Sequence, residues 1–418
     1  MSGRYRPPRG TKDFLSGEAY TSVFLENKAR EIFYLYGYRE VKLPLIENKD
    51  IFIRSLGEST EVVEKQILEI SSRENLCLRP EATAQIVRAY IGHSLYLQRL
   101  VKLFYIGPMF RGERPQKGRF RQFHHIGAEA IGEKDPLLDT ELIGLAEKLL
   151  VSFGIKDFYL EINSLGCEED KNRFKSLLKK KLTDKVKLLC ENCQKRFFTN
   201  PLRILDCKEA NCRKVVNSLD IGNSYLCKSC LSYFEQVCSL LDKRGIPYKV
   251  NPWLVRGLDY YTQIVFEFNS DNLGSQKAVG AGGRYDGLVR ELGGPDKPGC
   301  GFALGLERIL LLRNLEKFSP LKVFVAYTSS ELKSKAFELL TELRDEGVSS
   351  DMRFEFSSLK SQLRYAQKLG VEFVVILGEE ELKNNQVSLR DMKASSQERL
   401  SLDGLIGFLK KGGNVKDA

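Results

Sequence analysis

The sequence lacks the features that would place the chain in or across a membrane. No stretch approaches the ~18 consecutive apolar residues of a membrane-spanning helix, and the opening MSGRYRPPRGTKDF contains no apolar segment of a secretory signal. We therefore expect a cytoplasmic protein. Apolar residues make up 42% and charged residues 29%, which excludes a disordered chain. A length of 418 residues predicts two or three domains, and no internal repeat is visible.

Positive charge is present in excess but is unevenly distributed. The chain has 65 Lys and Arg against 55 Asp and Glu, a net charge of +10. Residues 167–245 hold 17 basic against 10 acidic residues, a net of +7, whereas residues 322–418 hold 15 of each. A basic balance favours an anionic partner. We expect residues 167–245 to provide most of the electrostatic attraction.

Patterns of apolar residues predict an α+β fold with an antiparallel sheet. A helix is expected over residues 18–36, followed by a strand over 38–45 that Pro44 should confine to a sheet edge. Further strands are expected over residues 76–78, 100–110, 120–129 and 264–268. Turn residues at 115–118 make residues 101–126 a long antiparallel hairpin. Strands in succession with few helices between them favour an α+β class.

Changes in pattern divide the chain into four parts. Residues 1–166 and 246–320 have the same character, and the short lysine-rich helical stretches of residues 167–245 interrupt them as an insertion. Residues 322–418 alternate strand and helix, with strands at 323–327 and 373–377, which predicts a small α/β domain with a parallel sheet.

Several motifs carry candidate functional residues. Residues 110–121 carry five cations and one acid, Glu113, which is compatible with a solvated basic turn or with a clamp for a polyphosphate. RPEAT (79–83) could cap a helix or hold an ammonium group. RGLDYY (256–261) and the glycine-rich VGAGGRYD (279–286) predict an aromatic wall and a closely packed floor. GFALGLER (301–308) is expected to begin an amphipathic helix.

In this order the motifs resemble the class II aminoacyl-tRNA synthetases, and within them the histidyl-tRNA synthetase family. FRGERPQKGRFRQF (110–123) is similar to motif 2 of the class, GFALGLER to motif 3, and the first helix, strand and Pro44 to motif 1. Residues 256–262 and 278–288 resemble two signatures of the histidine enzymes, and PRGT (8–11) resembles their N-terminal segment. The resemblance implies an antiparallel catalytic domain, a helical insertion and a C-terminal α/β anticodon-binding domain.

The same resemblance implies a reaction, partners and nucleotide-binding residues. It implies ATP-dependent ligation of L-histidine to tRNA(His) through a histidyl-adenylate, with ATP entering with Mg²⁺, in a homodimer joined through motif 1. Arg111 would hold the α-phosphate, Arg308 the γ-phosphate, Glu113 the adenine amino group, and Phe123 would stack on the adenine. Arg256 would act with Arg111 in catalysis by stabilising the charge that develops at the α-phosphorus.

The histidine site is implied in the same way. Glu81 and Thr83 would anchor the α-amino group, Glu129 and Tyr261 would bond the two imidazole nitrogens, and Tyr260 would pack alongside. The implied histidine-binding residues are Glu81, Thr83, Arg111, His125, Glu129, Arg256, Tyr260 and Tyr261. His125 departs from the family, which usually has Gln there. It could fill the same space, or alter the contact with the substrate, because neutral imidazole offers only one donor and one acceptor.

Six of the ten cysteines lie between residues 190 and 230. The two Cys-x2-Cys pairs, Cys190 with Cys193 and Cys227 with Cys230, supply four thiolates and predict a structural zinc site. The alternative is a set of reduced thiols in the core, with Cys207 and Cys212 between the pairs. A catalytic zinc is not expected, because no histidine or carboxylate lies near in the motif to leave an open position.

Two other functions are compatible with parts of the sequence. The family includes a regulatory paralogue that lacks the C-terminal domain and tends to lose motif residues, yet Arg111, Arg256 and Arg308 are all present here. A non-catalytic tRNA-binding module is disfavoured because no partner domain follows. For the leading hypothesis, we expect the insertion to bind acceptor-arm phosphates and the C-terminal domain to read bases. Adenylate formation should then be largely independent of the insertion.

Overall fold

The computed structural model describes residues 5–57, 60, 62–274, 276–313 and 321–410. These residues form two compact units. The first unit contains residues 5–13 and the described residues from Ser22 to Arg313, and the second contains residues 14–21 and those from Leu321 onward. Each unit has its own hydrophobic core.

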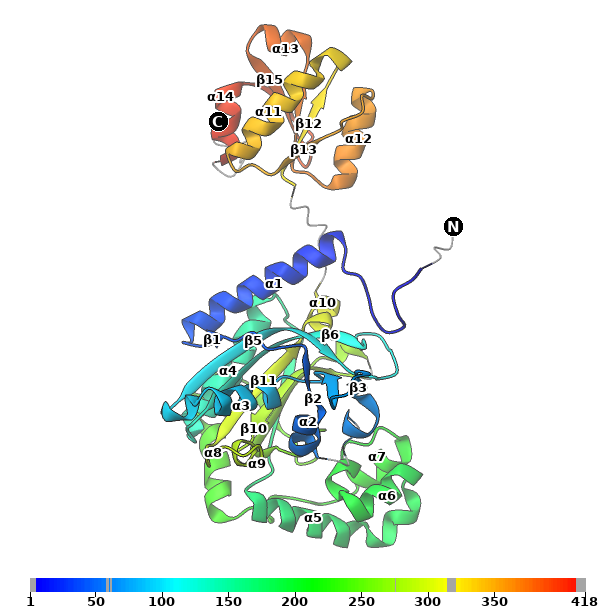
Figure 1. The fold of residues 1–418 in the computed structure, drawn as a ribbon, viewed down its shortest axis with the longest axis vertical. Coiled ribbons are helices and arrows are strands. Elements are labelled where there is room, and N and C mark those ends of the chain that lie inside the picture. The colour runs from blue at the N-terminus through cyan, green and yellow to red at the C-terminus, as the bar shows by residue number, and fades with distance from the viewer. Residues whose placement is uncertain (1–4, 58–59, 61, 275, 314–320, 411–418) are drawn as a thin grey trace. The chain divides into compact units, whose positions relative to one another are not determined.

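An eight-stranded sheet forms the centre of the first unit (Figure 1). In sheet order its strands are β1 (Arg39–Glu40), β5 (Val101–Phe110), β6 (Gln122–Ile131), β11 (Gly299–Gly305), β10 (Ala278–Arg284), β9 (Thr262–Asn269), β7 (Tyr159–Ser164) and β8 (Tyr248–Val250). Neighbouring strands are antiparallel except for the two outermost pairs, β1–β5 and β7–β8. The expected α+β class with an antiparallel sheet is confirmed.

The β5–β6 hairpin confirms the predicted pairing of the two longest strands. Its register runs from Val101 opposite Ile131 to Phe110 opposite Gln122, and Gln116 and Arg119 form a bridge within the connecting loop. The strand expected over residues 38–45 is shorter than predicted. Only Arg39–Glu40 pairs, at the sheet edge where the proline placed it, and the chain then enters a separate small sheet.

Helices and the small sheet surround the main sheet in Figure 1. The small sheet contains β2 (Ile46–Asn48), β4 (Leu76–Leu78) and β3 (Leu68–Glu69). The helices are α1 (Ser16–Leu35), α2 (Lys49–Leu56), α3 (Thr83–Gly92), α4 (Pro136–Ser152), α8 (Lys228–Lys243), α9 (Leu288–Glu291) and α10 (Leu306–Leu312). Helix α4 packs against β11 and α8, and α3 packs against α9. No helix of the described residues has the length and apolar character needed to cross a bilayer.

The helix start predicted at residues 301–308 is wrong for most of that motif. Gly299–Gly305 is strand β11, and the helix begins only at Leu306. The strand lies between β6 and β10 in the middle of the sheet and is largely buried. A strand buried on both faces and a buried helix are alike in apolar content. A short run such as Gly-Phe-Ala-Leu-Gly therefore cannot be assigned to either from periodicity alone.

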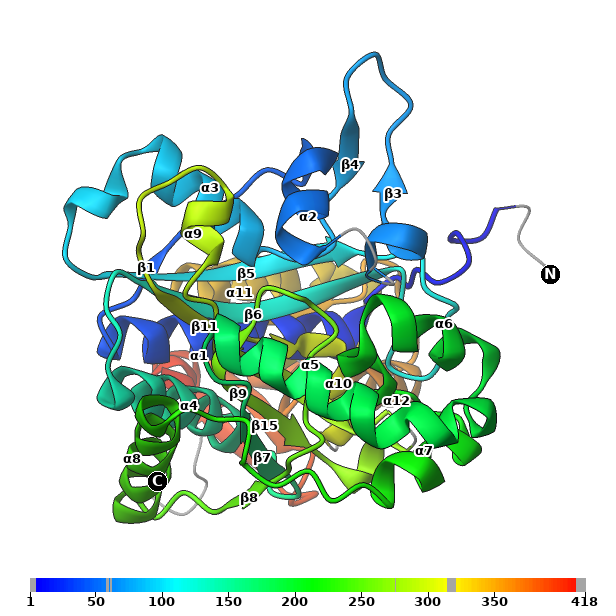
Figure 2. The ribbon, with the colours of Figure 1, turned by 90° about the horizontal axis from the view of Figure 1, so that it is seen from below.

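The insertion contributes α8 and three further helices with short 3₁₀ turns between them, and these three are seen together in Figures 1 and 2. These are α5 (Glu168–Leu182), α6 (Glu191–Thr199) and α7 (Ala210–Asn217), with 3₁₀ turns at Thr183–Leu188 and Pro201–Ile204. Its apolar residues join the core of the first unit. Nζ of Lys171 donates to the carbonyl of Tyr261 at 3.0 Å, and Arg203 to that of Gly257 at 3.0 Å. The insertion therefore contacts the RGLDYY segment, and the expected independence of adenylate formation from the insertion stays a prediction.

The second unit is an α/β domain around a five-stranded sheet in the order β13 (Ser350–Met352), β12 (Val323–Tyr327), β14 (Phe373–Leu377), β15 (Gln386–Asp391) and β16 (Gln397–Ser401). Its helices are α11 (Lys333–Asp345), α12 (Leu359–Leu369), α13 (Glu379–Lys383) and α14 (Leu402–Lys410). The predicted parallel sheet is only partly confirmed. The first three strands are parallel, whereas β15 and β16 extend the sheet as an antiparallel hairpin that the strand–helix alternation did not predict.

Candidate active site

A single cavity brings together the predicted nucleotide and histidine residues, which lie far apart in the sequence. The cavity is lined by all eleven of them: Glu81, Thr83, Arg111, Glu113, Phe123, His125, Glu129, Arg256, Tyr260, Tyr261 and Arg308. They come from the β5–β6 hairpin, from the start of α3, from the segment before β9 and from α10. We call the part around Arg111 and Arg308 the nucleotide half, and the part around Thr83 and Glu129 the histidine half.

Arg111 in the nucleotide half is held at the end of β5. Its Nε donates to the carbonyl oxygen of Pro80 at 2.9 Å, and its guanidinium lies 5.3 Å from the ring centroid of Phe123. Burial lowers the pKa of Arg111, although Glu113 opposes the shift. Since Nη1 of Arg111 is 3.9 Å from the nearest Glu113 oxygen, the charge is only loosely compensated. Such a cation attracts an anion.

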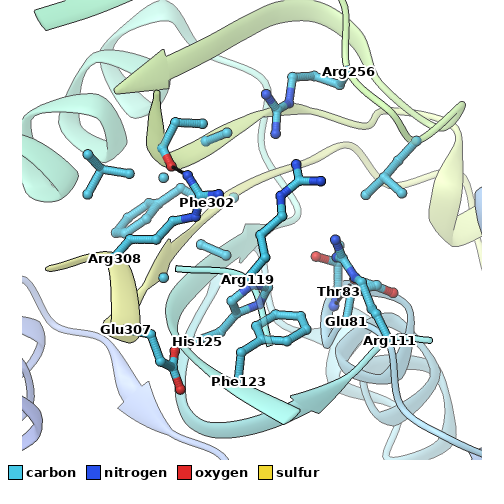
Figure 3. Close-up of a pocket in the computed structure, with 18 of the residues that line it drawn as sticks. Glu81, Thr83, Arg111, Arg119, Phe123, His125, Arg256, Phe302, Glu307 and Arg308 are labelled. Carbon is cyan, nitrogen blue, oxygen red and sulfur yellow. Dashed lines mark hydrogen bonds between the residues drawn. The ribbon is translucent and has the colours of Figure 1, made fainter. Parts of the chain in front are cut away.

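Two more arginines complete the nucleotide half. Figure 3 shows Arg119 reaching into the middle of the cavity, between Arg308 on one side and Arg111 on the other. Nη1 of Arg119 lies 3.1 Å from Oε2 of Glu113. Nη1 of Arg308 donates to the carbonyl oxygens of Gln276 at 2.8 Å and Ala278 at 2.5 Å. Burial, followed by repulsion from Arg119, lowers the pKa of Arg308 to about 10. Three guanidinium groups against one carboxylate fit a polyphosphate.

Glu307 fixes the position of α10 relative to β6. Its two carboxylate oxygens each lie 2.9 Å from the backbone nitrogen of His124, and Oε1 lies 2.8 Å from Nδ1 of the same residue. The Glu307 side chain is buried. The carboxylate therefore acts as a positioning group that holds Arg308 beside the strand that carries Phe123.

Glu129 is the central residue of the histidine half and is 1% exposed. Its Oε1 accepts a hydrogen bond from the hydroxyl of Thr83 at 2.7 Å, and Oε2 accepts one from Tyr285 at 2.5 Å. Burial raises the pKa of Glu129 to about 8, although both hydroxyl donors counteract the shift. A Cβ on Gly301 would lie 1.6 Å from Oε2 of Glu129. Only glycine at that position leaves room for this carboxylate.

Glu81 serves as the cap of helix α3. Its oxygens accept hydrogen bonds from the backbone nitrogens of Thr83 at 2.6 Å and Ala84 at 3.0 Å. Burial raises its pKa, while these backbone donors oppose the shift. The capping interpretation of the RPEAT motif is therefore seen in the structure. The cap does not exclude an ammonium ligand, because a carboxylate offers about four acceptor sites and Glu81 also lines the cavity.

His125 lies in β6 between the two halves. Its ring contacts Phe123 edge-on, with centroids 5.1 Å apart. Burial and the nearby charge of Arg111 lower its pKa to about 3, so the imidazole is neutral at physiological pH. Nδ1 is buried and has no hydrogen-bond partner among the described residues. A buried polar atom without a partner is costly, so a ligand that bonds Nδ1 would relieve that cost.

The arginine and the two tyrosines of RGLDYY close the cavity. Arg256 forms an ion pair with Oε2 of Glu267, which lies in β9. Its Nε is buried and has no hydrogen-bond partner within the described part of the chain. The rings of Tyr260 and Tyr261 lie 4.6 Å apart, and Tyr260 contacts the ring of Tyr285 edge-on. An aromatic wall of this kind excludes water around whatever binds beside it.

Four residues of the site were not predicted as functional. Arg119 was counted only as one of the hairpin cations, and Tyr285 only as part of a glycine-rich string. Glu267 carried no sequence signal, since single acidic residues in a strand are common, and Glu307 was quoted only as part of GFALGLER. Their roles follow from the pairing of β9, β10 and β11, which no local pattern records.

The structure corrects the predicted zinc ligands. Cys190 and Cys193 do not meet Cys227 and Cys230. The first pair gathers with Cys207 and Cys212, which we call the first cluster; the second pair gathers with Cys167 and Asp170, which we call the second cluster. All ten cysteines are free thiols. The two Cys-x2-Cys pairs were predicted to form one site, because spacing along the chain does not tell which pairs come together in space.

An antiparallel sheet that carries an arginine-bearing hairpin, followed by a strand–helix motif that ends in Arg308, defines the catalytic domain of a class II aminoacyl-tRNA synthetase. Residues 10–309 match the family described as histidyl-tRNA synthetase, and residues 322–412 match the anticodon binding domain. The chain belongs to the histidyl-tRNA synthetase family.

Individual relatives agree with this assignment. The chain is 44% identical to the histidine–tRNA ligase of Syntrophotalea carbinolica over 402 residues, which covers 95% of this chain and 96% of that protein. It is 43% identical to the histidine–tRNA ligase of Desulforamulus reducens over 411 residues, or 96% and 98% of the two chains. The crystal structure of apo S. aureus histidyl-tRNA synthetase matches with a TM-score of 0.77 at 33% identity, over 97% of this chain and 100% of that one.

Proposed function

We propose that this chain joins L-histidine to tRNA(His) in two steps within the cavity. In the first step, a carboxylate oxygen of histidine attacks the α-phosphorus of ATP and pyrophosphate leaves, which gives histidyl-adenylate. In the second, a hydroxyl group of the terminal adenosine of the tRNA attacks the acyl carbon and AMP leaves. The observation that carries this proposal is the direct junction of a cationic half with a carboxylate–hydroxyl half in one cavity.

The nucleotide half fits ATP, which would enter as its magnesium complex. Arg111 would bind the α-phosphate and Arg308 the γ-phosphate, where their remaining N–H donors match phosphate oxygens. Phe123 would stack on the adenine, and Glu113 would accept from its amino group. Glu113 is held at 3.1 Å from Arg119, so its carboxylate is already oriented before the nucleotide arrives.

The histidine half fits an amino acid with a polar ring. Glu81 and Thr83 would accept from the α-ammonium group, and Glu129 would accept from one imidazole nitrogen while Tyr261 bonds the other. Tyr260 would pack against the ring. The two hydroxyl groups that already donate to Glu129 leave further lone pairs on its oxygens for a substrate N–H. His125, through its unpaired Nδ1, would contact the polar groups of the substrate backbone.

Arg256 is the residue to which we assign catalysis, together with Arg111. Charge moves onto the phosphate oxygens as the carboxylate attacks, and a fixed guanidinium stabilises that charge without reorganising. The ion pair with Glu267 fixes the side chain while its Nε remains without a partner in the described structure. Such a step needs positioning and charge more than a proton-transfer base.

The partners follow from the same assignment. The second unit would bind the anticodon, and the cationic insertion would bind acceptor-arm phosphates. A homodimer is proposed because the motif 1 region exposes large apolar side chains, and Leu35 is 83% exposed. The others are Val23, Phe24, Tyr34, Leu45 and Ile46. Clustered apolar exposure marks an interface. We also propose a cytoplasmic location, which fits a protein that charges tRNA for translation.

Histidine-dependent exchange of pyrophosphate into ATP tests the first step. We expect exchange with histidine and none with glutamine, followed by esterification of tRNA(His) transcripts. If no amino acid supported exchange, the proposed catalytic function would be wrong, and a regulatory or tRNA-binding role would be favoured. Sedimentation velocity of the same preparation tests the dimer, and a stable, active monomer would contradict it.

A further inference from the structure

The first cluster arranges four sulfurs at the spacing of a metal tetrahedron. Its ligand atoms all lie within 4.8 Å of one another, and the sulfurs of Cys190 and Cys207 are 3.9 Å apart. Four thiolates around one zinc ion, with Zn–S bonds of about 2.3 Å, lie about 3.8 Å from each other. A disulfide needs about 2.05 Å. The sulfurs are therefore placed for a shared ion and not for bonds between them.

The local backbone supports this arrangement. Cys190 directly precedes α6 and Cys193 lies in its first turn, while Cys207 lies ahead of α7 and Cys212 lies within that helix. The backbone nitrogen of Cys190 donates to the sulfur of Cys212 at 3.2 Å. A hydrogen bond of this kind favours the thiolate and orients it, as donors behind metal ligands do.

The second cluster is less suited to a cation, although it contains a carboxylate. Asp170 already accepts from the backbone nitrogens of Cys167 at 3.3 Å and Cys227 at 3.0 Å. It also forms an ion pair with Arg173. A metal ion there would have to displace or face that guanidinium. Asp170 is thus occupied in ordering the start of α5.

We propose that Cys190, Cys193, Cys207 and Cys212 bind one Zn²⁺ ion as four thiolates in a structural site of the insertion. Cys193 and Cys212 are fully buried, so the site has no open position for a substrate. Tetrahedral sulfur ligands also suit iron. The close mutual approach of all four sulfurs favours a single ion over a cluster of two or more metals, which would spread the thiolates further apart.

The ion would have a role in the active site, because the chain between the two cysteine pairs contacts the histidine signature. Asn200 and Arg203 donate to Oδ1 of Asp259 at 3.1 and 3.0 Å. Arg203 also donates to the carbonyl of Gly257. Gly257 and Asp259 lie between Arg256 and Tyr260. Tying α6 to α7 would thereby fix the loop that carries Arg256.

Metal analysis of the purified full-length protein tests the site. We expect about one zinc per chain, and loss of it in Cys193→Ser and in Cys212→Ser. Cys230→Ser is the matched control, since it removes a buried thiol from the second cluster and should keep the zinc. A wild-type protein without zinc, or one that contains iron, overturns the proposal. Loss of zinc in Cys230→Ser with retention in Cys193→Ser would assign the ion to the second cluster and also overturns it.

Cobalt substitution tests the same metal site in the wild-type protein, so it does not depend on whether the serine variants fold. The wild-type protein, stripped with a chelator and reloaded with Co²⁺, should show the intense visible bands and sulfur-to-cobalt charge-transfer absorption of a tetrahedral thiolate site. Weak octahedral bands would contradict it. Removing the ion should lower histidine-dependent exchange several-fold and restore it on reloading. Metal content is measured without reference to pyrophosphate exchange. A protein that binds zinc but shows no exchange would therefore contradict the proposed function and not the metal site.

Discussion

In the nucleotide half of the cavity, Arg111 and Arg308 are held by main-chain carbonyl oxygens, whereas in the histidine half Glu129 is held by hydroxyl groups of other side chains. Carbonyl acceptors hold a guanidinium in place without neutralising it, so the nucleotide half stays cationic in the free protein. Hydroxyl donors stabilise a buried carboxylate only in part, and the pKa of Glu129 rises to about 8. We therefore expect the nucleotide half to accept polyphosphates in general and the histidine half to discriminate between amino acids.

This difference predicts two modes of recognition, one in each half of the cavity. Phosphate groups are recognised by charge, which tolerates small displacements, whereas an imidazole is recognised by hydrogen bonds that must all be made at once. A buried site with unpaired polar groups rejects the wrong ligand strongly. We therefore expect substitutions in the nucleotide half to act on rate and those in the histidine half to act on amino-acid binding.

The largest effect is expected from Arg256→Ala, in the segment that closes the cavity. Removing one preorganised donor at developing charge costs about 10²–10³-fold in rate. Adenylate formation should fall by that factor in single-turnover measurements, while ATP binding by equilibrium dialysis changes little. Glu267→Gln leaves the guanidinium in place but removes its ion-pair partner, and should cost less. Equal losses of rate and ATP affinity in Arg256→Ala would contradict this role.

Residues that line both halves could be predicted from the sequence, but the contacts that hold them in place could not, and the reason is physical. Arginines on one hairpin are neighbours because of local turn chemistry, so Arg111 and Phe123 were placed correctly by the β5–β6 pairing. The bond from Tyr285 to Glu129 depends on β10 lying beside β11 and β11 beside β6, which is a non-local arrangement. The same limit explains the wrong cysteine grouping and the strand mistaken for a helix at residues 301–305.

Glu129→Gln should have the next largest effect, confined to histidine. An amide keeps the volume but replaces one acceptor by a donor, which opposes the hydroxyl of Tyr285 or Thr83. At a pH of about 9, where the carboxyl group with its raised pKa of about 8 is mostly ionised, loss of a hydrogen bond to a charged group, at about 1.5–3 kcal/mol, predicts a fall of roughly 10–150-fold in kcat/KM for histidine. The KM for ATP should stay within about twofold, since this carboxylate does not touch the nucleotide half.

Tyr285→Phe is the matched control for that variant. It removes one donor to Glu129 but leaves the carboxylate, so its effect should be smaller and in the same direction. Both are measured by pyrophosphate exchange at varied histidine and fixed ATP. If Glu129→Gln raised the KM for ATP as much as that for histidine, the separation of the two halves would be wrong.

The pH dependence of histidine binding separates Glu129 from His125. The pKa of Glu129 is raised to about 8, so its carboxyl group becomes increasingly ionised as pH rises from 7 to 9. The KM for histidine should then fall as the acceptor forms, by up to about tenfold, because one pH unit below the pKa about a tenth is ionised. His125, with a pKa of about 3, stays neutral throughout and contributes no slope. The substrate histidine also titrates over this range, and it does so equally with the wild type and with Glu129→Gln. Subtracting the pH profile of KM for Glu129→Gln from that of the wild type therefore isolates the contribution of the carboxyl group. A difference profile without slope would show that Glu129 does not bind the imidazole as a carboxylate.

The smallest effect is expected from His125→Gln, which introduces the residue that the family resemblance implies at this position. The imidazole is neutral and its Nδ1 has no partner among the described residues, so the change alters hydrogen bonding without altering charge. A glutamine amide offers two donors and one acceptor. One additional hydrogen bond of about 1 kcal/mol would lower the KM for histidine about fivefold, with kcat unchanged. His125→Ala, which offers no polar atom, should raise the KM instead. If both variants raised it equally, the imidazole would be making a contact that glutamine cannot reproduce, and the histidine half of this chain would have adapted around His125.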